Sequence, residues 1–136
     1  MSNKSDGNKF EREFCEILFE HDFWVHNMAQ NQHGQPADVI AVKDGKAFLI
    51  DCKVCSTSKG FPFNRIEENQ YYAMDYWAIK GNGNGWFAIF FEEDIYMVSL
   101  DTIRMFKVIG HNALKPQDIK DVGVPIERWL NNYLYY

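Results

Sequence analysis

Two aspartates and a lysine stand where they could hold a divalent metal and cut a phosphodiester. Asp38 precedes one short apolar run, Asp51 follows the next, and Asp44-Gly45 lies between the two runs. An Asp-Gly pair in this setting is a strong signal for a β-hairpin. The outer ends of a hairpin lie side by side, so we expect Asp38 beside Asp51. Lys53 should share a face with Asp51, because side chains alternate along a strand.

Charges at the end of an otherwise apolar hairpin are costly unless they pair or bind a metal. Mg²⁺ prefers oxygen ligands and keeps several waters, so one or two carboxylates can hold it. Asp38 and Asp51 are the predicted metal ligands, with the backbone carbonyl of Cys52 as a third. A bound metal lowers the pKa of a water, and the Lys53 ammonium can orient that water or stabilise the transition state. The alternative is a structural salt bridge at the hairpin end.

Two helices are expected to direct further polar side chains at this site. In the first, residues 7–22, Glu11 lies at the edge of an apolar stripe, from where it could reach a metal or a metal-bound water. In the second, residues 66–80, Gln70 stands in the middle of the stripe. Glu11 could instead be an ordinary surface acid, and Gln70 could simply satisfy a buried backbone group.

The other elements follow from apolar periodicity and turn residues. They are a strand after residue 22, loops over 27–35 and 56–64, a hairpin over 86–100, a helix over 102–108, a loop through 115–116 and a final helix over 125–134. The fold class is therefore α/β: a mixed central sheet flanked by helices, with a C-terminal helical tail. The length fits a single domain over residues 1–136, with a core of about 7–100 and an extension of 101–136.

Composition favours a soluble intracellular protein. No apolar run is long enough to span a membrane, and the N-terminus lacks the apolar segment of a signal peptide. Three cysteines without secretory context fit a reducing cytosol, so we expect a cytoplasmic location in a bacterial or phage-infected cell. The net charge of −5 does not by itself indicate nucleic-acid binding. Residues 38–65, however, carry more basic than acidic side chains, so bound metal would make that face positive.

These residues resemble the PD-(D/E)XK nuclease superfamily. Asp38 and the triplet Asp51-Cys52-Lys53 look like its signature. Residues 7–14, with Gly7 four positions before Glu11, resemble the opening helix of archaeal-type Holliday-junction resolvases. The Phe61-Pro62-Phe63 segment and Gln70 resemble RecU-type resolvases. The resemblance covers about residues 7–100 and implies a restriction-endonuclease-like core of order α-β-β-β-α-β, with Glu11 completing the metal site and Gln70 facing it.

The resemblance implies an endonuclease that depends on Mg²⁺ or Mn²⁺ and cuts branched DNA such as Holliday junctions. It also implies a homodimer, because cutting two strands symmetrically needs two sites. The predicted catalytic residues are Glu11, Asp38, Asp51, Lys53 and Gln70. The candidate DNA contacts are Lys9, Gln30, Asn31, His33, Lys59 and Arg65. Alternative functions are a restriction- or repair-type nuclease on duplex DNA, and a non-catalytic nuclease fold that binds nucleic acid or protein.

Two aromatic segments remain open at this point. Phe61 and Phe63 could stack on unpaired bases or pack against the sheet. Residues 129–136 are expected to dock on the domain or on a partner subunit. Cys52 and Cys55 form a C-x-x-C pattern, but a strand position does not suit a redox dithiol, and no further ligands have zinc-site spacing. We expect Cys52 to be a core thiol.

Overall fold

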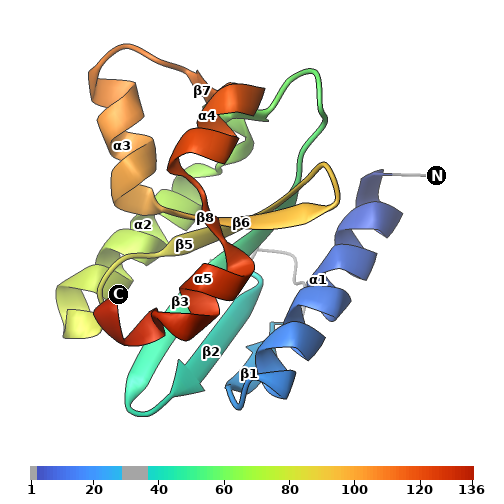
Figure 1. Cartoon of the computed structure of the whole chain (residues 1–136). Coiled ribbons are helices and arrows are strands. Elements are labelled where there is room, and N and C mark those ends of the chain that lie inside the picture. Colours follow the sequence, from blue (N-terminus) through green and yellow to red (C-terminus); the bar gives the residue numbers. More distant parts are fainter. Residues whose placement is uncertain (1–2, 29–36) are drawn as a thin grey trace.

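The structure, a computed structural model, describes residues 3–28 and 37–136, without the side chains of residues 3–5. Within these residues, a six-stranded mixed sheet has the order β1-β2-β3-β5-β6-β8 (Figure 1). Its strands are β1 (Trp24–Asn27), β2 (Val39–Lys43), β3 (Lys46–Val54), β5 (Trp86–Phe91), β6 (Asp94–Ser99) and β8 (Val124–Pro125). Only the β3–β5 pair is parallel among the pairs of this described sheet.

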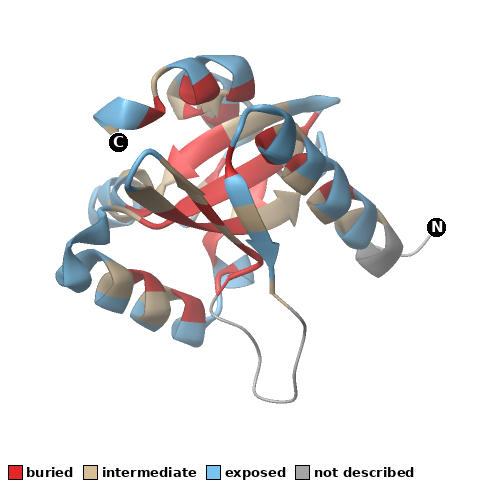
Figure 2. Ribbon diagram, turned by 90° about the horizontal axis from the view of Figure 1, so that it is seen from below, coloured by how far each residue is buried: buried red, intermediate tan, exposed pale blue. Residues whose placement is uncertain are grey.

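Helices cover both faces of the sheet, as expected. The helices are α1 (Asn3–Glu20), α2 (Glu68–Trp77), α3 (Leu100–Val108), α4 (Pro116–Val122) and α5 (Ile126–Asn131). Side chains of α1 and α5 share one apolar cluster with Phe48 and Ile50. Side chains of α2, α3 and α4 share a second cluster with Leu49. The buried residues therefore concentrate in the central strands and on the inward sides of the helices (Figure 2).

The β2–β3 hairpin has the predicted form. Asp44 and Gly45 adopt φ of 52° and 78°, which is the positive-φ pair that a tight hairpin turn with strand-matching twist requires. Val39 lies opposite Ile50, so Asp38 follows the strand pair outward and lies against the later part of β3. Phe48 and Ile50 face α1, whereas Leu49 faces the second cluster. The predicted alternation is thus confirmed, and Asp51 continues the face of Leu49.

Several boundaries differ from expectation. The first helix starts at Asn3 rather than Gly7, and the second starts at Glu68 rather than Ile66, whose backbone is extended. Short segments η1 (Phe63–Arg65) and η2 (Ala78–Asn82) flank α2. Gly81 has a φ of 91° within η2, so the helical run does end in the predicted glycine-rich stretch.

The chain beyond α3 differs most. The loop expected through Pro116 is wrong, because this proline opens α4 at a position where its missing N–H costs nothing. The helix expected from Pro125 starts one residue later, since Pro125 belongs to β8 and pairs with Tyr96. A two-stranded sheet of β4 (Phe61–Pro62) and β7 (Ala113–Leu114) was not predicted.

The aromatic C-terminus docks on the domain. The Trp129 ring stacks on Phe23 at 6.0 Å between centroids and meets Phe48 edge-on at 4.9 Å. Tyr133, the first residue of η3 (Tyr133–Tyr135), is also buried. These contacts confirm packing on the domain and make residues 101–136 part of the fold. Across the described chain, none of the helices is long and apolar enough to cross a bilayer.

Candidate active site

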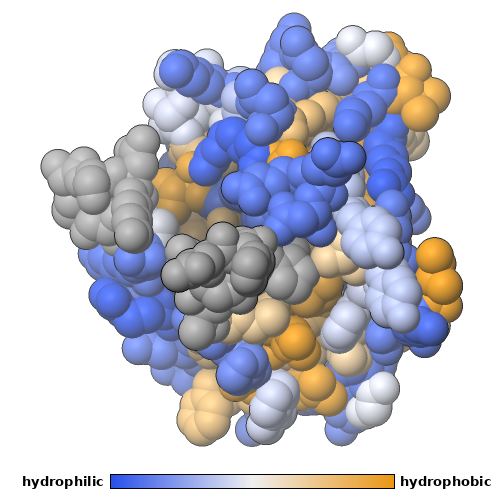
Figure 3. All heavy atoms as spheres, turned by 180° about the vertical axis from the view of Figure 1, so that it is seen from behind, coloured by the Kyte–Doolittle hydropathy of each residue, from blue (hydrophilic) through white to orange (hydrophobic). Residues whose placement is uncertain are grey.

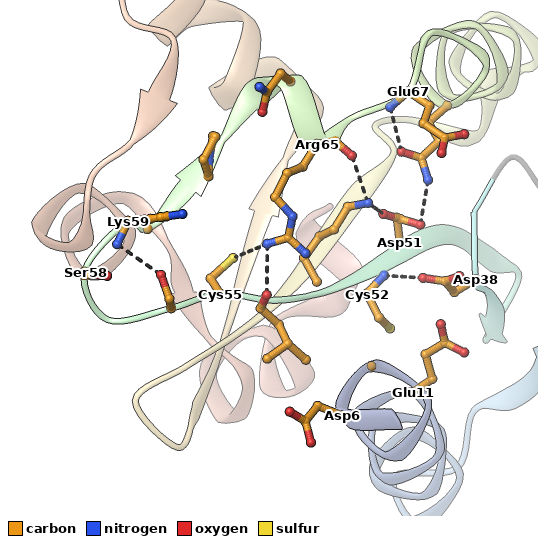
Figure 4. Close-up of a pocket in the computed structure, with 18 residues that line it drawn as sticks. Asp6, Glu11, Asp38, Asp51, Cys52, Cys55, Ser58, Lys59, Arg65 and Glu67 are labelled. Atoms are coloured by element: carbon orange, nitrogen blue, oxygen red, sulfur yellow. Dashed lines mark hydrogen bonds and ion pairs between the residues drawn. The ribbon is translucent and has the colours of Figure 1, made fainter. Parts of the chain in front are cut away.

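A pocket of about 910 Å³ lies over the end of β3, between α1, the start of α2 and the loop that follows β3 (Figure 4). Eight predicted site residues line this pocket: Glu11, Asp38, Asp51, Cys52, Lys53, Lys59, Arg65 and Gln70. Lys9 does not line it and instead lies 3.9 Å from Glu13 on exposed helix surface. Gln30, Asn31 and His33 lie outside the described residues.

Asp38 is held against the end of β3 by main-chain and side-chain contacts. Its N–H donates to the Ile50 carbonyl at 3.1 Å, and its Oδ2 accepts from the Cys52 N–H at 2.8 Å. Both contacts lie on the edge of β3 that faces β2. The N–H and C=O of one strand residue point to the same edge, so the Cys52 carbonyl lies on this edge too. Asp38 and the Cys52 carbonyl therefore lie beside the same space, just beyond the end of β2.

Asp51 is the most enclosed charged group of the pocket, with 2% of its surface exposed. Its Oδ1 accepts from Gln70 Nε2 at 3.0 Å. Lys53 Nζ lies 2.9 Å from its Oδ2 and also donates to the Arg65 carbonyl at 3.2 Å. The Lys53 contact with Oδ2 is an ion pair without the alignment of a hydrogen bond, so Oδ2 is a buried oxygen lacking a well-aligned donor among the described residues.

Gln70 is positioned by the start of its own helix. Its Oε1 accepts from the Glu67 N–H at 3.1 Å, one of the main-chain donors that a helix start leaves unpaired. This contact turns Nε2 toward Asp51. Gln70 is 7% exposed. Its side chain satisfies a backbone group and also contacts Asp51, while its part in catalysis stays a prediction.

Burial and the neighbouring Asp38 charge make Asp51 and Glu11 hard to ionise. Burial, and then the nearby Asp38 charge, raise the pKa of Asp51 to about 8, although Lys53 opposes this. Burial and Asp38 also raise the pKa of Glu11 to about 7. The Glu11 and Asp38 carboxylates approach each other from α1 and the hairpin (Figure 4). Such crowding of like charges is typical of functional sites, and a bound cation would reverse both shifts.

The donor set fits a hard divalent cation. No three histidine, cysteine or acidic side chains of residues 3–28 and 37–136 stand close enough to form a complete metal cage. Mg²⁺ needs only one or two carboxylates, because it retains waters. Asp38, Asp51 Oδ2 and the Cys52 carbonyl supply oxygen ligands of this kind, and Glu11 lies beside them. A salt bridge alone does not explain the site, since the single charge of Lys53 cannot balance the charges of three neighbouring carboxylates.

Other predicted residues have structural contacts. The Arg65 guanidinium donates to the Val54 carbonyl at 2.9 Å and contacts Cys55 Sγ at 3.5 Å, while its role as a phosphate contact stays a prediction. Of the two alternatives for Phe61 and Phe63, packing within the fold is confirmed, because both rings are buried. Cys52 behaves as a core thiol, and burial raises its pKa well above the usual range.

Asp6 and Glu67 also line the pocket and were not predicted. Asp6 fell outside the expected helix, which was placed four residues too late. Glu67 precedes α2, and a negative charge next to the N-terminus of a helix is a recognisable signal.

Comparison with known proteins places this site in a family. The family model of archaeal Holliday junction resolvases (Hjc) matches residues 2–133. Among solved structures, that of Hjc from Archaeoglobus fulgidus, a Holliday junction resolvase from an archaeal hyperthermophile, has a similar fold at a TM-score of 0.64 and 15% identity. The match covers 93% of this chain and 96% of that one. A search of curated proteins found no significant match. The chain therefore belongs to the archaeal Holliday junction resolvase family, within the PD-(D/E)XK superfamily.

Proposed function

We propose that this chain is an endonuclease that hydrolyses phosphodiester bonds in branched DNA with Mg²⁺ or Mn²⁺ as cofactor. The observation that carries this proposal is the convergence of Asp38, Asp51 and Lys53 in one pocket, with Glu11 beside them. The family supports branched DNA as the substrate. The charged residues support hydrolysis, because a protein that only binds DNA gains nothing from clustered carboxylates that repel phosphate.

Asp38, Asp51 and the Cys52 carbonyl would hold the metal, and Glu11 would contribute from α1. When bound, the metal would supply a water of lowered pKa and neutralise charge on the phosphate. Lys53 keeps its ammonium at the floor of the pocket through the Arg65 carbonyl. From there its N–H groups can donate to a phosphate oxygen that gains charge. Gln70 holds Asp51 Oδ1, which leaves Oδ2 as the ligand atom.

The Asp51–Lys53 contact has a consequence for cofactor binding. Lys53 lies on the same oxygen, Oδ2, that is assigned to the metal. The two cations therefore compete for Asp51, and the second anchor on the Arg65 carbonyl keeps Lys53 in the pocket when Oδ2 is taken. We propose that this arrangement holds the lysine near the scissile phosphate.

A cleavage panel tests the proposal. Purified protein is incubated with fluorescent four-way junctions, linear duplex and single strands, in Mg²⁺, Mn²⁺ or EDTA. We expect cleavage of the junction in either metal and none in EDTA, with activity lost in Asp51→Asn and Glu11→Gln. Glu13→Gln is the matched control, because Glu13 lies on the exposed side of the same helix. The proposal fails if no substrate is cut, or if Asp51→Asn cuts as well as wild type.

Other outcomes identify the alternatives. Equal cleavage of duplex and junction would indicate a duplex nuclease. A protein that binds the junction but does not cut it, and whose Mg²⁺ affinity is the same in wild type and Asp38→Ala, would be a binding module. We also propose a homodimer, which light scattering of the purified protein tests directly. Its proposed setting is the cytoplasm of a bacterial or phage-infected cell, in keeping with three free thiols.

A further inference from the structure

A second groove opens beside the active-site pocket. Its volume is about 660 Å³, and it shares Lys59, Pro62 and Asn64 with the pocket. Its far wall carries Tyr71 of α2 and Lys107 of α3. The two hollows therefore adjoin at β4, and their linings together extend from Asp51 to Lys107 of α3.

The charge of the lining changes across the shared wall. Of the residues that the structure describes, five acidic ones line the pocket and none lines the groove. Among the described residues, neither Lys59 nor Lys107 forms an ion pair. The adjacent Arg104 differs, because its Nη2 lies 2.8 Å from Asp75 Oδ2 and its charge is neutralised. In a protein of net charge −5, the groove is thus a local concentration of positive charge.

The groove suits phosphates rather than bases. Lys107 Nζ lies 4.5 Å from the centroid of the Tyr71 ring and donates to the Tyr71 hydroxyl at 3.3 Å. This lysine covers the ring that a base would otherwise stack on, and the Phe63 ring is buried. The other polar side chains of the lining are the exposed amides Asn64 and Asn112, which can donate to phosphate oxygens. Hydrophilic side chains also gather over the upper part of the molecule seen from behind (Figure 3).

We infer that this groove binds the sugar–phosphate backbone of the DNA arm that leaves the active site, with Lys59 and Lys107 as its cationic contacts. The inference rests on the proposed function, because the same DNA must present its scissile phosphate to Asp38 and Asp51. The pocket and the groove differ in how they interact with phosphate. The carboxylates of the pocket repel phosphate until metal neutralises them, whereas the groove attracts phosphate with or without metal.

The test measures binding in EDTA, where the pocket contributes least. Affinity for a four-way junction is determined by fluorescence anisotropy at several salt concentrations, for wild type and for the double variant Lys59→Gln/Lys107→Gln. Glutamine at 107 keeps a donor for the Tyr71 hydroxyl while removing the charge. We expect binding to weaken roughly tenfold, and the slope of log affinity against log salt to fall by about two, one per lost phosphate contact.

Lys46→Gln is the matched control, because Lys46 lies at the turn end of the hairpin, away from both hollows. It should leave the salt slope unchanged, and thermal melting should show all variants folded. Junctions with arms cut back to a few base pairs should bind wild type and the double variant equally. If the double variant keeps the salt slope of the wild type while the wild type cuts junctions, the groove does not bind DNA, and the proposed function still stands. Wild-type protein that neither binds nor cuts any DNA overturns both.

Discussion

The metal-free protein should lose stability between pH 5 and pH 7 because of Asp51. Burial and the Asp38 charge raise the pKa of this carboxyl from 3.8 to about 8 in the folded protein. Between these two values the folded chain holds a proton that the unfolded chain releases. The free energy of unfolding therefore falls as the pH rises. The stabilisation from this retained proton is fully present below the pKa that Asp51 has in the unfolded chain. It is lost as the pH rises through the pKa that Asp51 has in the folded protein.

The size of the effect follows from one retained proton. Each pH unit within this window changes the free energy of unfolding by about 1.4 kcal/mol. Two units, from pH 5 to pH 7, amount to roughly 3 kcal/mol from Asp51. Glu11 acts in the same direction up to its pKa of about 7, but it is only partly buried, so solvent screening reduces its share.

The assay is urea unfolding in EDTA at pH 5, 6 and 7, for wild type and Asp51→Asn. The difference between the two proteins isolates Asp51 from the other titrating groups. We expect the wild type to lose about 3 kcal/mol relative to the variant over this range. Asp75→Asn is the matched control, because Asp75 is a more exposed carboxyl whose pKa Arg104 lowers. Added Mg²⁺ should restore stability increasingly toward pH 7, since a metal binds the deprotonated carboxylate.

Parallel pH profiles of wild type and Asp51→Asn would refute this reasoning. They would mean that Asp51 ionises as easily in the folded protein as in the unfolded chain. Mg²⁺ would then have no ionisation cost to offset at this site, and the argument that crowded carboxylates call for a cation would lose its basis.

Four substitutions give further predictions. Lys53→Ala should lower the cleavage rate about 100-fold or more while still binding Mn²⁺ by calorimetry, because the proposed ligands Asp38 and Asp51 remain. Gln70→Ala should weaken Mn²⁺ binding about 10- to 100-fold by leaving Asp51 Oδ1 without its donor. Arg65→Ala should lower kcat about tenfold, because the loop that anchors Lys53 loses its clamp on β3; unchanged kcat would contradict this. Trp129→Ala should cost about 3–5 kcal/mol in urea unfolding, since its ring is fully buried.

The parts of the site that follow local rules were predictable. The Asp-Gly turn and the alternation of β3 set which side chains meet at the hairpin end, and both depend on a few adjacent residues. Gln70 was recognisable because a polar residue in an apolar stripe needs a partner. Its partner Asp51 lies on β3. The two residues were predicted from separate elements, so each prediction supported the other.

The ends of elements were less predictable, for physical reasons. A proline breaks a helix at interior positions but is favourable at its first position. Whether Pro116 ends or begins a helix therefore depends on the residues that follow it. The first residues of α1, from Asn3 to Asp6, are all polar, so no apolar periodicity indicates that the helix begins there. Pro125 enters a strand because β6 offers it an edge to pair with, which is a tertiary effect.

The proposed DNA groove illustrates why the path of a substrate is harder to predict than the chemistry of the site. Lys59 and Lys107 are far apart in the sequence, and neither lies in a motif. They face one hollow because Phe61 pairs with Leu114 and Pro62 with Ala113, a contact of two residues on each side. Strands this short carry no periodic signal, so the pairing emerges only when Phe61 and Leu114 are buried together. The residues proposed to cut the phosphodiester are thus recognisable from the sequence of the hairpin, whereas the proposed path of the DNA depends on the β4–β7 contact, which forms only on folding.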